Sequence, residues 1–287
     1  MTALVIDEAI RRIIAVGGNL QQIALNDNFC WPSPLPSGNN PDAKYKLAQL
    51  IRANQALYDY TLAFKTPCVS GKDSMSMDGT VKESDGSEVR ISALPTIQFS
   101  AVGKIDDVRK CITMDVKKPG DLVYLLGITR DELGGSEYYE MRGEIGLNVS
   151  KVDGKAAAKL YNDLSEAIEE GLVDSCHGIY KGGLAVALVQ ISFAGGYGLE
   201  IDLDKVSTED LKRADKILYS ESASRFIVTI SPENKLRFEE IMKGDICKQI
   251  GAVKDDEELK IIANEKTIIQ ENIYKLKTAW QEAFKNF

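Results

Sequence analysis

The sequence predicts a protein of two domains, each of which combines α-helices and β-strands. The chain has 287 residues, which is long enough for two domains that each bury a core of their own. Apolar residues at helical spacing alternate along the chain with shorter runs typical of strands. A charged Pro-Gly turn at residues 117–121 precedes a fresh apolar strand. We therefore expect a first domain over residues 1–117 and a second over residues 118–287.

The composition is that of a soluble globular protein, with 44% hydrophobic and 27% charged residues. No apolar run approaches the length of a membrane-spanning helix, and the N-terminal apolar residues are interleaved with charges, unlike a secretory signal. The net charge of -8 argues against a surface that binds nucleic acids. We therefore expect a cytoplasmic protein that binds neither membranes nor nucleic acids.

The cysteines and the histidine exclude two further classes of site. The five cysteines are scattered without a Cys-x-x-Cys pair, so we do not expect a zinc site. We expect the thiols to be reduced and mostly buried. His177 is the one histidine, and the chain has no Gly-x-Ser-x-Gly motif, which disfavours a Ser-His-Asp hydrolase. We expect His177 to be structural.

The N-terminal part begins with a predicted helix over residues 2–16, which ends at Gly17-Gly18 because glycine adopts a left-handed turn at least cost. A short strand over residues 23–25 leads into the polar cluster Asn26-Asp27-Asn28, for which an ordinary polar strand end stays open as an alternative. Asn40-Pro41 is typical of a helix start, an N-cap residue followed by proline. The apolar residues of that second helix form one stripe: Leu47, Leu50, Ile51, Leu57, Tyr58 and Leu62.

After this helix, residues 77–90 are predicted to form an exposed excursion with turns at Asp78-Gly79 and Asp85-Gly86. The alternation over residues 96–103 predicts a half-buried strand. The second domain is predicted to contain strands at residues 122–126, 175–177, 199–203 and 225–230, helices at 153–170 and 184–193, and an amphipathic tail at 273–284. Glycines at 171, 182–183 and 195–196 mark the helix boundaries.

One stretch, Ser70-Gly71-Lys72-Asp73-Ser74, suggests a ligand site. The apolar residues 67–69 predict a strand and residues 70–74 the turn that leaves it, with a glycine beside a cation and a hydroxyl. Backbone N–H groups at such a turn, assisted by an ammonium group, can hold phosphate oxygens. The P-loop pattern does not match, since Thr66 replaces its first glycine and Asp73 its magnesium-binding hydroxyl. An ordinary surface turn stays open as an alternative.

Seven segments, which run in order over nearly the whole chain, together resemble the second half of the formylglycinamidine ribonucleotide synthetase family, also called phosphoribosylformylglycinamidine synthases. They are Ile6-Asp7-Glu8-Ala9, Asp27-Asn28-Phe29-Cys30-Trp31-Pro32, Lys44-Tyr45-Lys46-Leu47-Ala48-Gln49-Leu50, Ser70-Gly71-Lys72-Asp73-Ser74-Met75, Pro119-Gly120-Asp121-Leu122-Val123-Tyr124, Leu133-Gly134-Gly135-Ser136-Glu137-Tyr138-Tyr139 and Ser220-Glu221-Ser222-Ala223-Ser224-Arg225-Phe226.

The resemblance implies a fold of the aminoimidazole ribonucleotide synthetase type, with an α/β N-terminal domain and an α+β C-terminal domain. It implies an ATP- and magnesium-dependent reaction in which formylglycinamide ribonucleotide and ammonia from a glutaminase form formylglycinamidine ribonucleotide. The implied partners are the first synthetase half, which carries the catalytic histidine and most magnesium ligands, and the glutaminase. The chain alone is then expected to be inactive and, because an interdomain sheet is left unpaired, to form a homodimer through its N-terminal sheet.

By the same resemblance, Gly71 and Lys72 correspond to nucleotide and phosphate contacts and Ser74 to a substrate contact. Asp73, Asp27 and Asn28 are further candidates for nucleotide or substrate binding. Some relatives place a metal-binding asparagine where Lys72 stands, so the lysine is expected to meet phosphate directly, since a cation does not ligate a cation.

The chain departs from the family where many members read His-Asp-x-Ser-Asp-Gly-Gly. Here residues 177–183 read His-Gly-Ile-Tyr-Lys-Gly-Gly, which lacks both carboxylates and the serine. Arg12 stands where another metal-binding asparagine is found, and Glu8 alone keeps its acidic counterpart as a weak metal candidate. We therefore expect no metal site in this half and a degenerate auxiliary nucleotide site, whose space Lys181 and Arg12 fill with positive charge.

Two other hypotheses stay open. The chain could be a structural or dimerisation module without chemistry, or a self-sufficient homodimeric ATP enzyme of the same superfamily. The latter usually carries an Asp-rich metal segment and an intact Asp-Gly-Gly, which this chain lacks. The start of the first helix at Thr2, where the family has a preceding strand, favours a fragment or a separate subunit.

Overall fold

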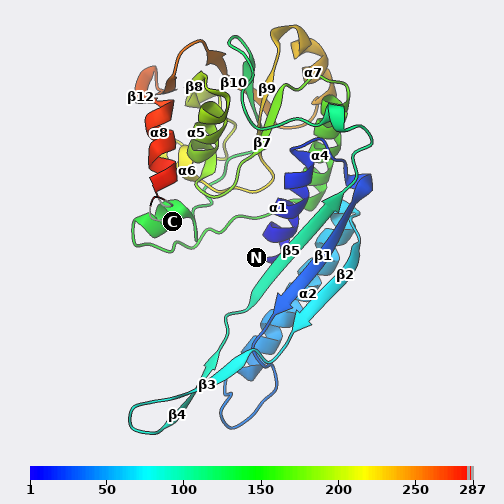
Figure 1. The fold of residues 1–287 in the computed structure, drawn as a ribbon, viewed down its shortest axis with the longest axis vertical. Coiled ribbons are helices and arrows are strands. Elements are labelled where there is room, and N and C mark those ends of the chain that lie inside the picture. Colours follow the sequence, from blue (N-terminus) through cyan, green and yellow to red (C-terminus); the bar gives the residue numbers. More distant parts are fainter. Residues whose placement is uncertain (283–284, 286–287) are drawn as a thin grey trace.

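The computed structural model describes residues 1–282 and 285, and Figure 1 shows two sheets joined end to end in one elongated molecule. The N-terminal sheet has the strand order β2-β1-β5. Strand β1 (Ile23–Cys30) pairs in parallel with β2 (Cys68–Ser74) and antiparallel with β5 (Thr96–Gly103). Helices α1 (Thr2–Ile14) and α2 (Ala43–Phe64) cover one face of this sheet, where Phe29 and Ile97 pack with Ala53. The opposite face is open.

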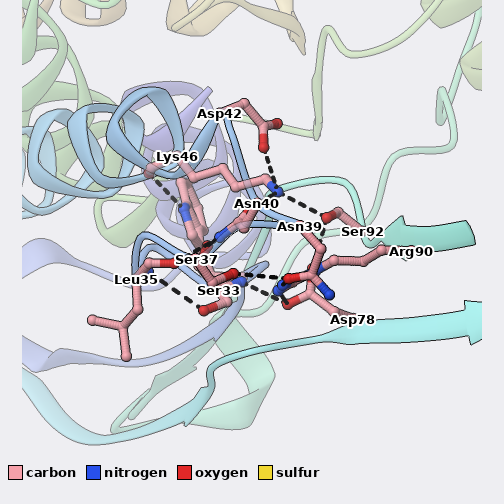
Figure 2. Close-up of polar contacts among 11 residues, drawn as sticks. Ser33, Leu35, Ser37, Asn39, Asn40, Asp42, Lys46, Asp78, Arg90 and Ser92 are labelled. Carbon is pink, nitrogen blue, oxygen red and sulfur yellow. Dashed lines mark hydrogen bonds and ion pairs between the residues drawn. The ribbon is translucent and has the colours of Figure 1, made fainter.

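A hairpin of β3 (Asp78–Lys82) and β4 (Glu88–Ser92) extends from the far end of the N-terminal sheet. Figure 2 shows the polar cluster that fixes the hairpin to the proline-rich loop and to α2. The Asp78 carboxylate pairs with Arg90 at 2.9 Å and accepts hydrogen bonds from Ser92 Oγ (2.6 Å) and the Ser33 amide (2.8 Å). The buried Lys46 ammonium bridges the same Ser92 hydroxyl to Asn40. These bonds to charged groups, chiefly those from Arg90 and Ser92, hold the pKa of Asp78 well below its ordinary value.

The C-terminal sheet has seven strands in the order β12-β11-β8-β10-β6-β9-β7. Its pairings are antiparallel except for β11 with β8. The strands are β6 (Leu122–Leu126), β7 (Ser175–Gly178), β8 (Gly198–Asp202), β9 (Phe226–Ile230), β10 (Cys247–Lys254), β11 (Glu258–Ala263) and β12 (Lys266–Asn272).

Helices cover both faces of this sheet. Helices α1, α4 and α7 contribute to the core on one face, and α5, α6 and α8 to the core on the other. The C-terminal helices are α3 (Glu137–Met141), α4 (Gly154–Glu169), α5 (Gly183–Gly195), α6 (Ala214–Tyr219), α7 (Lys235–Ile241) and α8 (Ile273–Gln281). Short 3₁₀ turns lie at Leu20–Gln22, Val108–Lys110, Leu203–Lys205 and Pro232–Asn234. None of the described helices combines the length and apolarity that a membrane crossing requires.

Helix α1 belongs to both halves of the molecule. Its residues Ile6, Ile10 and Ile14 are fully buried in one core with Tyr161 of α4 and Phe226 of β9. One hydrophobic core therefore extends across the predicted division at residues 117/118, and that division stays a prediction.

A buried polar network lies where α1 meets the C-terminal half of the molecule. Asp7 accepts hydrogen bonds from the Tyr161 hydroxyl and from Ser224 Oγ (2.6 Å), and it pairs with Arg11 at 3.4 Å. Because Asp7 and Arg11 are both buried, removing either one would leave an uncompensated charge.

Most predicted elements are confirmed. The first helix, the strand at 96–103, the strand at 122–126 and the glycine-bounded helices α4 and α5 lie where the sequence predicts them, within a few residues. The turn at Asp85-Gly86 is also confirmed, with Gly86 at φ +86°. The predicted tail is helical as far as Gln281, and Phe284 lies outside the described residues.

Four predictions were wrong. Helix α2 begins at Ala43 behind Asp42, because the Asn40 side chain instead bonds the loop carbonyls of Ser33 and Leu35. Asp78-Gly79 lies within β3 rather than in a turn. Much of the α2 stripe is exposed, including Leu47, Ile51, Tyr58 and Leu62, since the helix buries Ala43, Ala53 and Phe64. The cysteines are not mostly buried: Cys176 is, whereas Cys68 and Cys111 are exposed.

Candidate functional site

The six residues proposed to bind nucleotide or substrate lie on two neighbouring strands. Strands β1 and β2 run in parallel with Asp27 opposite Gly71 and Asn28 opposite Lys72. Asp73 and Ser74 continue β2 at the same end. The structure thus brings together residues that are more than 40 positions apart in the chain.

The predicted turn at residues 70–74 was wrong, and so was the idea of a polar strand end at Asn26-Asp27-Asn28. Both segments lie inside extended strands, because each completes the backbone ladder of the other. A strand does not gather consecutive N–H groups into the concave nest that holds a phosphate. Side chains, rather than a backbone cradle, therefore determine what this site can bind.

Strand geometry divides the six residues between two faces. Successive side chains alternate, and Phe29 points toward α1 and α2, so Asp27 and its partner Gly71 share that helix-covered side. Asn28, Lys72 and Ser74 point from the open face. There the Lys72 ammonium donates a hydrogen bond to Ser74 Oγ. The open face thus presents an exposed cation next to a hydroxyl and an amide.

Gly71 has a steric role that the sequence did not reveal. A Cβ at this position would lie 2.6 Å from Asp27 Oδ1, closer than any normal contact. The glycine in the Ser-Gly-Lys-Asp-Ser stretch therefore makes room for the Asp27 carboxylate on the helix-covered side. Its assignment as a nucleotide contact stays a prediction.

Strand β5 widens the polar surface of the open face. Gln98 lies opposite Asn28, Ser100 opposite Asn26 and Thr96 opposite Cys30. All three β5 residues are exposed. The sequence marks Gln98 and Ser100 only as the polar half of an alternating strand, and their place beside Lys72 depends on the strand register. The face offers hydrogen-bond donors, acceptors and one ammonium group, a set that suits a polar anionic ligand.

Glu8, the candidate metal ligand, lies elsewhere and is already paired. Its Oε1 lies 2.6 Å from Arg12 Nη2, and that guanidinium lies 4.5 Å from the centre of the Tyr180 ring. Among the described residues no group of three or more His, Cys, Asp or Glu side chains could hold a metal ion. One carboxylate that is neutralised by arginine does not fit magnesium, which requires several hard oxygen ligands.

Within the segment at residues 177–183, the Tyr180 ring packs against Gly178. A Cβ at Gly178 would lie 2.5 Å from Tyr180 Cζ, so the ring occupies the space that a larger side chain at this position would need. Lys181 pairs with Glu137 at 2.5 Å and Arg12 pairs with Glu8, so neither cation is left uncompensated. The Tyr180 ring takes up the room beside Gly178, with the Arg12 guanidinium against it, and the expectation that Lys181 and Arg12 fill the nucleotide space stays a prediction.

His177 lies in this segment with its Nε2 3.0 Å from Gln190 Oε1. Burial lowers the pKa of His177, since the charged imidazolium is poorly solvated there. Within the part of the chain that the structure describes, the ring has one amide partner and no carboxylate bonded to it, which are the surroundings of a structural histidine.

Comparisons with known proteins agree with this architecture. The family model described as AIR synthase related protein, C-terminal domain, matches residues 118–264, which is just over half of the chain. The subunit PurL of phosphoribosylformylglycinamidine synthase from Methanocaldococcus jannaschii is 33% identical over 282 residues, covering 96% of this chain and 36% of the relative. The corresponding protein of Leuconostoc mesenteroides is 31% identical, covering 98% of this chain and 34% of the relative. The chain thus spans about a third of the length of these relatives.

Solved structures share the fold at low sequence identity. Thermotoga maritima PurL complexed with FGAR superposes with a TM-score of 0.71 at 19% identity, over 96% of this chain and 42% of that one. Escherichia coli HypE, a hydrogenase maturation protein, gives a TM-score of 0.66 at 14% identity, over 94% of this chain and 78% of that one. The fold is mixed α/β, and the match over residues 118–264 identifies the chain as a member of the AIR synthase-related family.

Proposed function

We propose that the chain is the second synthetase half, or a separate subunit, of an ATP-dependent ligase in purine biosynthesis. The ligase converts formylglycinamide ribonucleotide and glutamine-derived ammonia into formylglycinamidine ribonucleotide. Support comes from the relatives named phosphoribosylformylglycinamidine synthase subunit PurL, which match at least 96% of this chain. Because the chain spans about a third of their length, we propose that it is inactive until the first half and a glutaminase supply the rest.

The observation that carries this proposal is the open face of the N-terminal sheet. Lys72, Ser74 and Asn28 gather there on adjacent strands and on one side, Lys72 exposed and the other two partly exposed. We assign the Lys72 ammonium to a phosphate group of the nucleotide or substrate, and Ser74 and Asn28 to hydrogen bonds that orient the substrate. Such contacts contribute to catalysis by positioning the reactants and by stabilising phosphate charge.

In the proposed reaction ATP activates the amide oxygen of the substrate, and ammonia then displaces the phosphate. Magnesium supplies charge neutralisation on the triphosphate, but the described residues of this chain do not fit it, and we assign its ligands to the first half. This chain contributes one polar wall, and the partner half closes the site against water. A cytoplasmic location is part of the same proposal.

The N-terminal sheet also supports a proposal about assembly. Strand β2 is an edge strand with no strand neighbour beyond it in the part of the chain that the structure describes, and nearly all of its residues are exposed. An unpaired sheet edge readily pairs with another chain. We propose that residues 1–117 carry this pairing, with the first synthetase half in the complete enzyme and with a second copy when the chain is alone.

A second candidate is a self-sufficient homodimeric ATP enzyme. The observation in its favour is that this chain covers 78% of E. coli HypE, so a chain of this size can form most of a protein with this fold. The two candidates differ in whether one chain completes a site. A structural module without chemistry is the third possibility.

The experiment is an assay of ATP hydrolysis that depends on formylglycinamide ribonucleotide and ammonia. The chain is assayed alone and then with a separately expressed first half. Our proposal expects no turnover alone and turnover on mixing. Turnover by the chain alone favours the self-sufficient enzyme. A mixture without turnover, together with no nucleotide binding by calorimetry, favours the structural module.

A further inference from the structure

A cavity of about 600 Å³ lies beside the loop that joins α3 to α4. It is lined by residues of three segments, which lie within 130–132, 147–153 and 209–210. Its volume is in the range of pockets that hold small molecules, about 300–1,000 Å³. Five of the lining residues carry a carboxylate and two carry a positive charge, so the cavity attracts cations.

One of these carboxylates, that of Glu132, is buried and only half satisfied. The residue is 5% exposed, and its Oε1 accepts a hydrogen bond from the Lys151 amide at 3.1 Å. Because Lys151 belongs to the segment that lines the cavity, the carboxylate lies at the cavity wall. The other oxygen, Oε2, has no hydrogen-bond partner among the described residues. A buried carboxylate oxygen without a donor costs free energy, and a donor that enters the cavity removes this cost.

The cations of this region do not neutralise Glu132. The buried Arg225 guanidinium donates to two loop carbonyls at 2.6 and 2.9 Å. Of the two cations that line the cavity, Arg130 pairs with Glu209 at 3.1 Å, and Lys151 is exposed. Within the part of the chain that the structure describes, none of the three gives Glu132 Oε2 a hydrogen bond. The cavity therefore keeps a buried negative charge that a ligand can pair with.

The arrangement of the cavity walls favours an extended organic cation over a metal ion. Among the described residues no three or more His, Cys, Asp or Glu side chains are grouped so that they could hold a metal. A second carboxylate without a cation partner in the described part of the chain is that of the exposed Asp210. Apolar side chains also line the cavity, since Leu147 is 97% and Val149 53% exposed. Separated carboxylates beside an apolar wall suit a methylene chain with charged ends, whereas a metal requires converging oxygen ligands.

We propose that this cavity binds an aliphatic amine with at least two ammonium groups. One ammonium group donates to Glu132 Oε2, the methylene chain lies along Leu147, and a second ammonium group pairs with Asp210. An ammonium group has three N–H donors and no acceptor, so it matches a carboxylate oxygen that has no donor. A free polyamine and the lysine side chains of a partner protein share this chemistry. The inference does not rest on the proposed function, because it requires neither a nucleotide nor the first synthetase half.

The test is calorimetry of the whole chain with spermidine and with the peptide acetyl-Lys-Lys-amide at constant ionic strength, together with the NMR signal of the Lys151 amide. We expect saturable binding that moves this signal. Tighter binding of spermidine identifies a free polyamine, and tighter binding of the peptide identifies a partner's lysines. Glu132→Gln keeps an oxygen acceptor for the Lys151 amide but lacks the charge, so binding should weaken at least tenfold. Asp210→Asn should weaken it at least threefold, whereas Glu265→Gln on the exposed β11–β12 turn, the matched control, should bind like the wild type.

Three results would overturn the inference. One is that neither probe binds saturably. Another is equal affinity in the wild type and in Glu132→Gln, which would reduce the binding to general attraction by an acidic surface. The third is displacement of spermidine by an equal concentration of magnesium, which would show that the cavity does not distinguish an extended cation from a compact one. If Glu132→Gln does not fold, the exposed Asp210→Asn replaces it, and binding as tight as in the wild type would contradict the proposal.

Discussion

At the scale of single residues, Asp121 shows how burial changes a carboxyl group. The side chain is fully buried before β6, its nearest cation is Lys118 at 3.9 Å, and within the described residues neither carboxylate oxygen has a hydrogen-bond partner. Burial, followed by the charge of Asp174, raises the pKa of Asp121 to about 6. The folded protein therefore binds this proton more tightly than the unfolded chain does.

Asp121→Asn is expected to make the protein more stable at neutral pH. Because the folded-state pKa is raised, the free energy of unfolding falls as pH rises from about 4 to about 6. Above pH 6 the full loss of stability from the buried carboxylate charge is reached. The variant has no carboxylate charge to bury, so its free energy of unfolding should exceed that of the wild type by about 1–2 kcal/mol at pH 7.5. This difference should vanish near pH 4. Urea denaturation at a series of pH values measures it. An advantage that does not change with pH would show that the carboxylate charge is not the cause.

At the scale of elements, the closeness of β1 and β2 makes a prediction about Gly71. Gly71→Ala places a Cβ 2.6 Å from Asp27 Oδ1 and is expected to destabilise the protein by about 1–2 kcal/mol. In an Asp27→Ala background the same change should cost less than about 0.5 kcal/mol, since the clashing group is gone. Gly79→Ala in β3 is the matched control, because nothing lies within 4 Å of its Cβ position. Additive effects of the two changes in urea denaturation would refute the contact.

The elements also show what the sequence could predict. Helix α4 follows from its apolar periodicity, and α5 follows from its apolar run and the glycines at both its ends, which are local signals. Strands β10, β11 and β12 escaped prediction, although Leu259, Ile261 and Ala263 alternate with partly exposed residues. The acidic residues 255–257, a solvated turn, connect β10 to β11.

The candidate site was predicted as a set of residues but not as a geometry. The ordered family resemblance selected Asp27, Asn28 and residues 71–74, which do lie together. Their local sequence suggested turns, because glycine and polar residues favour turns when no neighbouring strand is considered. The pairing of β1 with β2, the division between two faces and the Tyr180 ring against Gly178 are contacts between distant or folded-back segments. Local propensity contains no information about them.

At the scale of the whole molecule, the exposed edge of the N-terminal sheet should determine the oligomeric state. The Val69 side chain is 70% exposed on the edge strand β2. If the chain alone forms a homodimer through this edge, Val69→Glu places like charges at the interface and should give a monomer. Sedimentation equilibrium measures this, with Leu236→Glu on the exposed surface of α7 as the control. A dimer that survives Val69→Glu would place the contact elsewhere.

The central claim is that this chain completes a shared ligase site through the open face of its N-terminal sheet. The most direct measurement is the rate of formylglycinamidine ribonucleotide formation by a separately expressed first half, titrated with wild-type chain or with Lys72→Ala. Lys82→Ala, an exposed lysine of the β3–β4 hairpin, is the matched control. We expect kcat/KM to fall at least tenfold with Lys72→Ala, about 1.4 kcal/mol of transition-state stabilisation, and to stay unchanged with Lys82→Ala. Equal rates with the wild type and with Lys72→Ala would contradict the account.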